Sequence, residues 1–152
     1  MTRSFVGLGA NLEDPRAQIE RALELLDAED GVDVVAVSTL RETDPVGYED
    51  QPRFLNGAAE LRTSLEAGEL LDRLLAIERC LGRVRGEGPR FGPRTIDLDL
   101  LLHGDQVIVE PGLQIPHPRL HERRFALEPL AELDPALVVP GLGPVQTLLA
   151  GL

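Results

Sequence analysis

The stretch GPRTIDLDLLLHG, Gly92 to Gly104, places two aspartates inside an otherwise apolar run that predicts a buried strand. Side chains alternate across a strand, so Asp97 and Asp99 share one face. The other face carries the apolar residues Ile96, Leu98, Leu100 and Leu102. A buried carboxylate is costly unless a cation compensates its charge. The stretch therefore predicts a leucine face packed on a core and a carboxylate pair on the opposite face.

The segments around this strand predict an α+β fold. Strands are expected over 4–10, 32–40, 54–63 and 106–109, and a helix follows the cap Asp14-Pro15. A second helical stripe runs from Glu66 to Gly82, and a loop after His117 leads into a third helix, a short valine strand and a weak terminal helix. The irregular alternation and hairpin-like links favour a mostly antiparallel sheet over a doubly wound parallel one.

Length and composition restrict the class of protein. With 152 residues, the chain is expected to form one domain over 1–152. Its net charge of −11 argues against nucleic acid or an anionic membrane as the main partner. No leader or membrane span is predicted, and the lone Cys80 excludes an internal disulfide, so we expect a cytoplasmic location. Cys80 is expected to be buried, and His103 and His121 to be solvated.

All fifteen basic residues are arginine, which excludes a P-loop lysine or a Schiff-base lysine. Any phosphate site must therefore use arginine, backbone N–H groups and metal. Nearly half of the arginines lie in two short segments, 82–94 and 117–124. They are Arg83, Arg85, Arg90, Arg94, Arg119, Arg123 and Arg124.

The aspartate pair is a candidate metal site. At a rise of about 3.3 Å per residue, Asp97 and Asp99 lie about 7 Å apart at Cα and their carboxylates can converge. Oxygen ligands favour Mg²⁺, with substrate phosphates completing the coordination, and the nearby arginines can bind phosphate oxygens. Taken alone, the pattern indicates a Mg-dependent phosphoryl-transfer site without a P-loop. The alternative is a solvated outer face of an antiparallel sheet.

A second constellation lies in the segment from Arg41 to Leu61. Phe54 and Asn56 are two residues apart on a predicted strand and point to the same face. An aromatic ring beside a carboxamide suits a planar heterocycle, and Phe125, after two arginines, is a candidate opposite wall. The alternatives are a core phenylalanine with a capping asparagine, and a core position for Phe125.

Five stretches together resemble the 6-hydroxymethyl-7,8-dihydropterin pyrophosphokinase family of folate biosynthesis, over about Phe5 to Leu133. They are GLGANL, ETDPVGYEDQPRFLN, IERCLGRVR, FGPRTIDLDLLLHG and PHPRLHERRFALEPL. The resemblance implies a ferredoxin-like, three-layer α+β domain whose mostly antiparallel sheet is flanked by helices. It also implies that the substrate hydroxymethyl oxygen attacks the β-phosphorus of ATP, so that diphosphate is transferred and AMP leaves.

The resemblance also implies roles for individual residues. Asp97 and Asp99 would ligate two Mg²⁺ ions and, with Arg83 and Arg94, carry the catalysis. The expected ATP-binding residues are Arg85, Arg94, His117, Arg123 and Glu78. The expected pterin-binding residues are Thr43, Pro45, Val46, Phe54, Asn56 and Phe125. For Glu78 the alternative is a surface glutamate on an amphipathic helix.

The expected partners are the small molecules ATP and 6-hydroxymethyl-7,8-dihydropterin, with no nucleic acid, membrane or obligate protein partner. The glycine- and proline-rich loop from Gly82 to Gly92 is expected to close over ATP and exclude water. Two other classes fit the residues alone. One is a regulatory binding module in which the aspartates hold a structural cation, and the other is a Mg-dependent nucleotide hydrolase.

Overall fold

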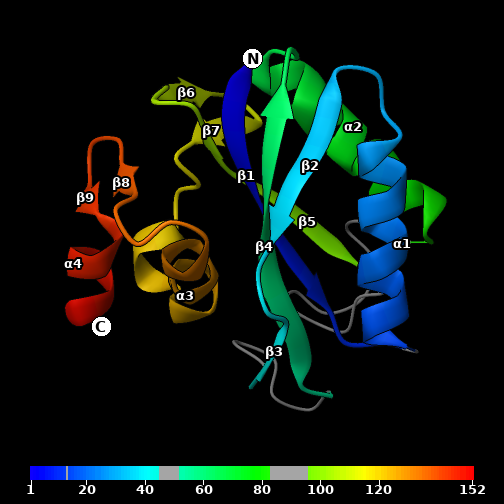
Figure 1. The fold of residues 1–152 in the computed structure, drawn as a ribbon, viewed down its shortest axis with the longest axis horizontal. Coiled ribbons are helices and arrows are strands. Elements are labelled where there is room, and N and C mark those ends of the chain that lie inside the picture. The colour runs from blue at the N-terminus through cyan, green and yellow to red at the C-terminus, as the bar shows by residue number, and fades with distance from the viewer. Residues whose placement is uncertain (13, 45–51, 83–95) are drawn as a thin grey trace.

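The computed structural model describes residues 1–12, 14–44, 52–82 and 96–152, and its centre is a five-stranded sheet (Figure 1). The strands are β1 (Thr2–Ala10), β2 (Val32–Val37), β3 (Arg41–Thr43), β4 (Phe54–Thr63) and β5 (Asp97–His103). They run in the order β2-β4-β1-β5, with β3 paired to β4. Every pair in this sheet is antiparallel, which confirms the predicted mixture of helices with an antiparallel sheet.

Helices lie on both faces of the sheet. Helices α1 (Pro15–Asp27) and α2 (Ala67–Cys80) cover one face, and α3 (Arg124–Leu133) and α4 (Val145–Ala150) lie on the other (Figure 1). The remaining elements are a 3₁₀ helix and two small hairpins. These are η1 (Leu120–Glu122), β6 (Ile108–Glu110), β7 (Leu113–Ile115), β8 (Val138–Val139) and β9 (Gly143–Pro144).

Local sequence signals account for the helix ends on the α1/α2 face. The Asp14 side chain accepts a hydrogen bond from the Ala17 N–H, with proline at the first helical position. Glu66 begins α2 through a capping box with Glu69. Gly82, just after α2, has φ of +94°, a conformation that favours glycine at a helix C-terminus.

Two apolar clusters hold the layers together. The first lies between the sheet and α1/α2 and contains Leu8, Leu70, Leu98 and Leu100. The second joins the sheet to α3 and α4 and contains the side chains of Phe5, Ala58, Leu101, Leu102, Leu127 and Leu130. Because both faces of the sheet are covered along part of its length, the polar site is confined to the part that α3 leaves open.

A bulge in β5 corrects one predicted contact. The register with β1 shifts so that Phe5 faces Leu102 while Val6 faces Leu100. Leu101 is thus the extra residue, and Leu101 and Leu102 both lie in the second cluster. The prediction that Leu102 shares the face of Leu98 was wrong, whereas the alternation holds over the aspartate pair.

Two further predictions were wrong. Cys80, expected in the core, is exposed at the end of α2. His103, expected in a solvated turn, is 1% exposed at the end of β5, and its Nδ1 lies 2.5 Å from Ser4 Oγ. His121 is exposed, as predicted. The strand β3 falls where a loop was expected, and β7 falls where no element was predicted.

The buried His103 predicts a pH dependence of stability. Burial lowers the pKa of His103 from its ordinary value of 6.5, and Glu66 and the Leu65 carbonyl only partly oppose this. The unfolded chain therefore takes up a proton first, and this contribution to stability is lost as the pH falls through 6.5. We expect the drop in Tm between pH 7.5 and pH 5 to be smaller in His103→Gln than in the wild-type chain. An equal drop in both proteins would contradict this account.

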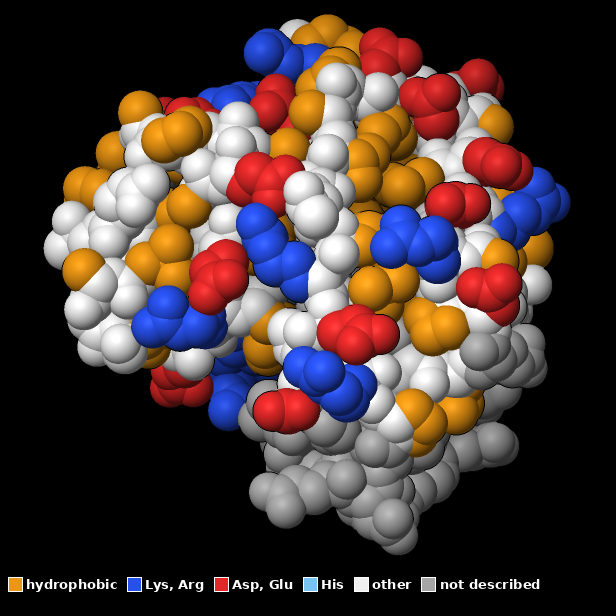
Figure 2. All heavy atoms as spheres, turned by 60° about the horizontal axis from the view of Figure 1, so that its bottom comes forward, with side chains coloured by type: hydrophobic (Ala, Val, Ile, Leu, Met, Phe, Trp, Pro, Cys, Tyr) orange, Lys and Arg blue, Asp and Glu red, His pale blue; other side chains and the backbone are white. Residues whose placement is uncertain are grey.

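Among the described residues, no helix has both the length and the apolar composition needed to cross a bilayer. On the face shown in Figure 2, arginine and acidic side chains are interspersed over the surface. An exposed ion pair joins Arg53 to Glu42, with an N···O distance of 3.4 Å. Exposed pairs of this kind contribute little to stability, about 0–1 kcal/mol each.

Candidate active site

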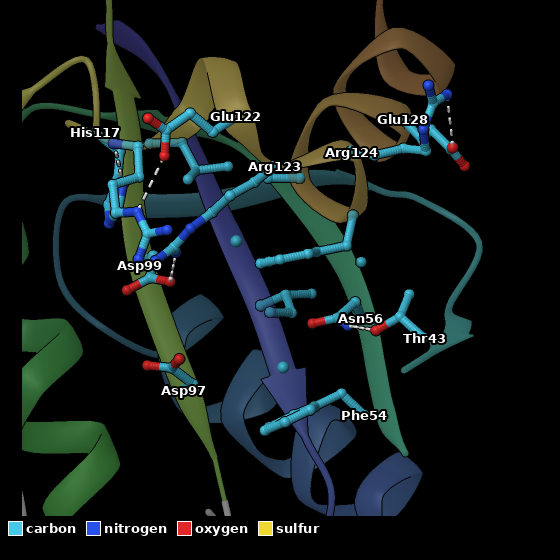
Figure 3. Close-up of a pocket in the computed structure, with 18 of the residues that line it drawn as sticks. Thr43, Phe54, Asn56, Asp97, Asp99, His117, Glu122, Arg123, Arg124 and Glu128 are labelled. Carbon is cyan, nitrogen blue, oxygen red and sulfur yellow. Dashed lines mark hydrogen bonds and ion pairs between the residues drawn. The ribbon is translucent and has the colours of Figure 1, made fainter. Parts of the chain in front are cut away.

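The site lies on the face of the sheet that carries α3, across three neighbouring strands (Figure 3). Gly9 of β1 is paired with Asp97 of β5 on one side and with Asn56 of β4 on the other. Gly7 is likewise paired with Asp99. Residues paired across antiparallel strands share a face, so the aspartates and Asn56 face the same space over a floor of glycine.

This space is a cavity of about 550 Å³. A Cβ at Gly9 would lie 2.9 Å from Asn56 Oδ1 and 3.9 Å from Asp97 Cβ, and a Cβ at Gly7 would meet Leu101 at 3.4 Å. The glycines therefore keep the space between the carboxylates and Asn56 open. The cavity is also lined by Thr43, Asp44, Phe54, Leu101, His117, Arg119, Glu122, Arg123, Arg124, Phe125 and Glu128.

The carboxylate end of the cavity has an arginine beside it. Arg123 precedes α3, and its Nη1 lies 3.9 Å from Asp99 Oδ2 (Figure 3). Its guanidinium also stacks on Phe125, 5.6 Å from the ring centroid. Two carboxylates beside a cation fit a site for Mg²⁺ and phosphate oxygens, because Mg²⁺ is commonly held by one or two protein carboxylates plus substrate. Among the described residues, no cluster of three or more His, Cys, Asp and Glu side chains has metal-binding geometry.

His117 is held neutral at the same end. Burial, together with the positive charges of Arg123 and Arg119, lowers its pKa from 6.5 to about 4, and Asp97 opposes this shift. Its Nδ1 accepts the backbone N–H of Arg119 at 3.3 Å. The proton of the neutral ring is therefore on Nε2, so His117 is a hydrogen-bond donor at neutral pH.

The other end of the cavity can bind a flat ring with hydrogen-bonding edges. Asn56 Nδ2 donates a short hydrogen bond to Thr43 Oγ1, which leaves Asn56 Oδ1 as the acceptor that faces Gly9 (Figure 3). Phe54 from β4 and Phe125 from α3 both line the cavity. Phe125 is also packed against the second apolar cluster, so the binding and core interpretations of this residue both hold.

Two carboxylates fix α3, and with it Phe125, relative to the sheet. Glu132 accepts the Thr39 N–H at 2.7 Å and binds Arg41 at 2.6 Å. The Thr39 N–H is the main cause of the lowered pKa of Glu132. At the end of α3, Asp134 binds Arg3 at 2.8 Å, which lowers the pKa of Asp134. The α3 wall is therefore tied to β3, which carries Thr43, and to β1.

The structure places eight of the predicted site residues around one cavity. They are Thr43, Phe54, Asn56, Asp97, Asp99, His117, Arg123 and Phe125. Glu78 is not among the lining residues, and it is 1% exposed, so the alternative of a surface glutamate was wrong. Some predictions concern positions outside the described residues. They are those for Arg83, Arg85, Arg94, Pro45 and Val46, and for the loop from Gly82 to Gly92, of which only Gly82 is described.

Sequence reasoning missed the floor and part of the rim of the cavity. Gly7 and Gly9 alternate with apolar residues in SFVGLGA, and this period of two is the signal that could have identified them. On the rim, Arg119 and Arg124 each pair with a glutamate, Glu122 at 3.2 Å and Glu128 at 3.5 Å. Each pair forms only when its segment is helical, because its two residues are three or four positions apart.

Comparison with known proteins agrees with this geometry. The model of the family described as 7,8-dihydro-6-hydroxymethylpterin-pyrophosphokinase (HPPK) matches residues 5–135, which include every residue named above as lining the cavity. The chain belongs to the HPPK family. This confirms the resemblance found in the sequence.

Relatives in two bacteria are named 2-amino-4-hydroxy-6-hydroxymethyldihydropteridine pyrophosphokinase. The protein from Pseudomonas aeruginosa is 48% identical over 148 residues, which cover 97% of this chain and 90% of the relative. The protein from Bacillus subtilis is 48% identical over 130 residues, which cover 86% of this chain and 77% of the relative.

A crystal structure of an HPPK-DHPS in complex with substrates has the same fold as this HPPK chain. The TM-score is 0.75 over 99% of this chain, at 13% sequence identity. The chain spans 43% of the length of that protein. At this identity the likeness bears on the fold alone.

Proposed function

We propose that this HPPK chain transfers diphosphate from ATP to the hydroxymethyl group of 6-hydroxymethyl-7,8-dihydropterin, with release of AMP, in folate biosynthesis. Family membership and the names of its relatives support this reaction. The observation that supports the proposal most strongly is that one cavity is lined both by the carboxylate pair of β5 and by Asn56. A donor and an acceptor substrate must meet in one space for direct transfer.

We propose that Asp97 and Asp99 hold two Mg²⁺ ions together with phosphate oxygens of ATP. Their carboxylates face the same side of β5, and the paired residues on β1 are glycines, so no side chain of β1 competes for that space. When bound, the metal lowers the pKa of the attacking alcohol and neutralises charge on the phosphates. The protein residues supply position and the rest of the positive charge.

Arg123 and His117 are proposed to bind the ATP phosphates. Arg123 lies near Asp99 and can exchange this long ion pair for phosphate oxygens when the cation compensates the carboxylate. Neutral His117 can donate its Nε2 proton to a phosphate oxygen. Arg83, Arg85 and Arg94, which lie outside the described residues, are proposed for the same charge-stabilising role on the strength of their motif.

The end of the cavity that contains Phe54 and Asn56, called the ring end below, is proposed to bind the pterin. Phe54 and Phe125 would lie against its faces, and Asn56 Oδ1 would accept hydrogen bonds from the N–H groups at its edge. Thr43 fixes the orientation of the Asn56 amide. Pro45 and Val46 are proposed to complete this pocket. The hydroxymethyl group would then project over the glycine floor toward the aspartates.

We also propose that the fold is of the ferredoxin-like class and that residues 1–152 form one pyrophosphokinase domain. With β3 set aside as an extra strand, the elements β1-α1-β2-β4-α2-β5 follow the β-α-β-β-α-β order of that class. The strand order β2-β4-β1-β5 and the antiparallel pairing support the assignment. We propose a cytoplasmic location, with ATP and the pterin as the only partners required.

Identification of the nucleotide product tests the proposed reaction. The chain is incubated with Mg²⁺ and ATP, with and without 6-hydroxymethyl-7,8-dihydropterin, and nucleotides are separated by chromatography. We expect AMP only when the pterin is present. ADP, or turnover that does not require the pterin, would instead indicate a nucleotide hydrolase. No turnover would favour a binding module.

Gly9→Ala tests the glycine floor. The added Cβ would lie 2.9 Å from Asn56 Oδ1 and displace the amide. We expect the KM for the pterin to rise about tenfold, because the loss of one hydrogen bond typically weakens binding by about this factor. The matched control is Gly68→Ala in α2, where the nearest atom, on Leu113, is 3.9 Å away. Steady-state kinetics with the pterin as the varied substrate make the comparison. A normal KM in Gly9→Ala would contradict the assignment of this end of the cavity to the pterin.

A further inference from the structure

Glu78 is a buried acidic residue that is not among the described residues lining the cavity. It lies on α2 with 1% of its surface exposed, and its Oε2 accepts the backbone N–H of Leu98 at 2.7 Å. A carboxylate in a core is costly unless it is hydrogen-bonded, so a structural or functional gain must offset its burial. Its partner, Leu98, is the residue between Asp97 and Asp99.

The position of Leu98 in the sheet explains why its N–H needs such a partner. β5 ends the strand order β2-β4-β1-β5, so among the described strands it pairs with β1 alone. Successive N–H groups along an antiparallel strand point alternately toward and away from the partner strand. The Leu98 N–H points away from β1 to α2, and Glu78 supplies the acceptor that a further strand would provide.

Glu78 reaches β5 from the face opposite the cavity. It shares its helix with Leu70, Leu74 and Ile77, which pack in the apolar cluster that also contains the Leu98 side chain. Asp97 and Asp99 line the cavity on the other face, whereas Glu78 does not. The hydrogen bond therefore fixes the peptide that joins Asp97 to Leu98 from outside the described lining of the cavity.

We propose that Glu78 is a positioning residue: by accepting the Leu98 N–H, it holds the Asp97 and Asp99 carboxylates in the orientation that binds the metal and ATP phosphates. This rests on the proposed function. Residues that hold metal ligands in place, without touching the metal themselves, are typically worth about 10–100-fold in metal affinity or activity when they are mutated. If the charge of Glu78 instead contacted ATP directly, Glu78→Gln would lose more activity than Glu78→Asp.

Two variants separate these roles. Glu78→Gln removes the charge but keeps a carbonyl oxygen at the same reach, whereas Glu78→Asp keeps the charge and shortens the side chain. Ile77→Val is the matched control, because Ile77 is buried on the same helix, 4% exposed, and the change lowers core packing alone. The measurements are Leu98 amide exchange by NMR in the ligand-free protein, binding of Mg²⁺ with α,β-methylene-ATP by calorimetry, and steady-state kinetics.

In Glu78→Asp we expect Leu98 amide exchange to rise, and both kcat and the affinity for the Mg²⁺ complex to fall, each by about tenfold or more, with the KM for the pterin unchanged. Glu78→Gln should recover most of each property. Ile77→Val should lower Tm without moving these readouts. A greater loss in Glu78→Gln than in Glu78→Asp, equal losses in both, or an unchanged Leu98 amide in Glu78→Asp would overturn the proposal.

The amide measurement keeps this test separate from the proposed function. It is made without substrates, so it reports the Glu78 to Leu98 hydrogen bond whatever reaction the chain catalyses. If the wild-type chain forms no AMP from ATP and the pterin, the proposed function fails. If the wild-type chain is active and Glu78→Asp keeps normal Mg²⁺ complex binding, the positioning role fails alone.

Discussion

Replacing Asp97 or Asp99 by asparagine is expected to lower kcat/KM by at least about 10³-fold, which corresponds to about 4 kcal/mol of transition-state stabilisation. Each carboxylate lies on the cavity face of β5, and the loss of one charge removes the ligand set that holds Mg²⁺ on the phosphates. The double variant should lose little more than either single variant, because the two side chains act as one unit. Steady-state kinetics at saturating Mg²⁺ measure the effect.

The fold should survive these changes. Two like charges on one strand face repel each other in the absence of metal, so we expect the Tm of the ligand-free variants to be unchanged or higher. Asp105→Asn is the matched control, since it removes the same charge from the exposed turn after β5. Activity within about twofold of wild type in Asp97→Asn or Asp99→Asn would exclude the carboxylate pair as the metal site.

Arg123→Gln is expected to lower kcat by about 10²–10³-fold, as the loss of one preorganised charge-stabilising donor typically does. The guanidinium lies 3.9 Å from Asp99 and stacks on Phe125, so it lies where the phosphate end and the ring end of the cavity meet. Its removal should therefore also raise the KM for the pterin, by a smaller factor than the loss in kcat. Kinetics with each substrate varied in turn separate the two effects.

Stability should change little in Arg123→Gln, because a partly exposed ion pair of this length contributes at most about 1 kcal/mol. Arg16→Gln, on the exposed surface of α1, removes the same charge at a residue that does not line the cavity and should keep normal kinetics. If the two arginine variants have the same kcat, Arg123 has no role in binding the reacting phosphates.

The residues that strand periodicity governs were predicted correctly. The alternation of IDLDL placed Asp97 and Asp99 on one face because a regular strand has a period of two. The spacing of Phe54 and Asn56 was read correctly for the same reason, and both line the cavity. Where the period is broken, at the bulge at Leu101, the same rule assigned Leu102 to the wrong cluster.

The errors come from contacts between distant segments. His103 is buried because Ser4 and the segment at Leu65 close around it, and neither partner is visible from the turn sequence that follows it. Arg41–Thr43 forms a strand because it pairs with the start of β4, although its local sequence is polar. Tertiary pairing overrode local propensity at both positions.

The helical spacing of α2 could have identified Glu78 as buried. It is four residues after Leu74 and eight after Leu70, and therefore on the buried stripe of α2. Only its acidic character suggested the surface. A charged residue on a buried stripe indicates a specific hydrogen-bond partner, which here is the Leu98 N–H.

The most direct test of the account is a crystal structure of the chain with Mg²⁺, α,β-methylene-ATP and 6-hydroxymethyl-7,8-dihydropterin. We expect metal bound to both Asp97 and Asp99, and the pterin ring between Phe54 and Phe125 with its edge on Asn56. The hydroxymethyl oxygen should lie about 3–3.5 Å from the β-phosphorus, in line with the bond that the reaction breaks. Metal bound away from the aspartates, or a pterin bound outside this cavity, would contradict the account.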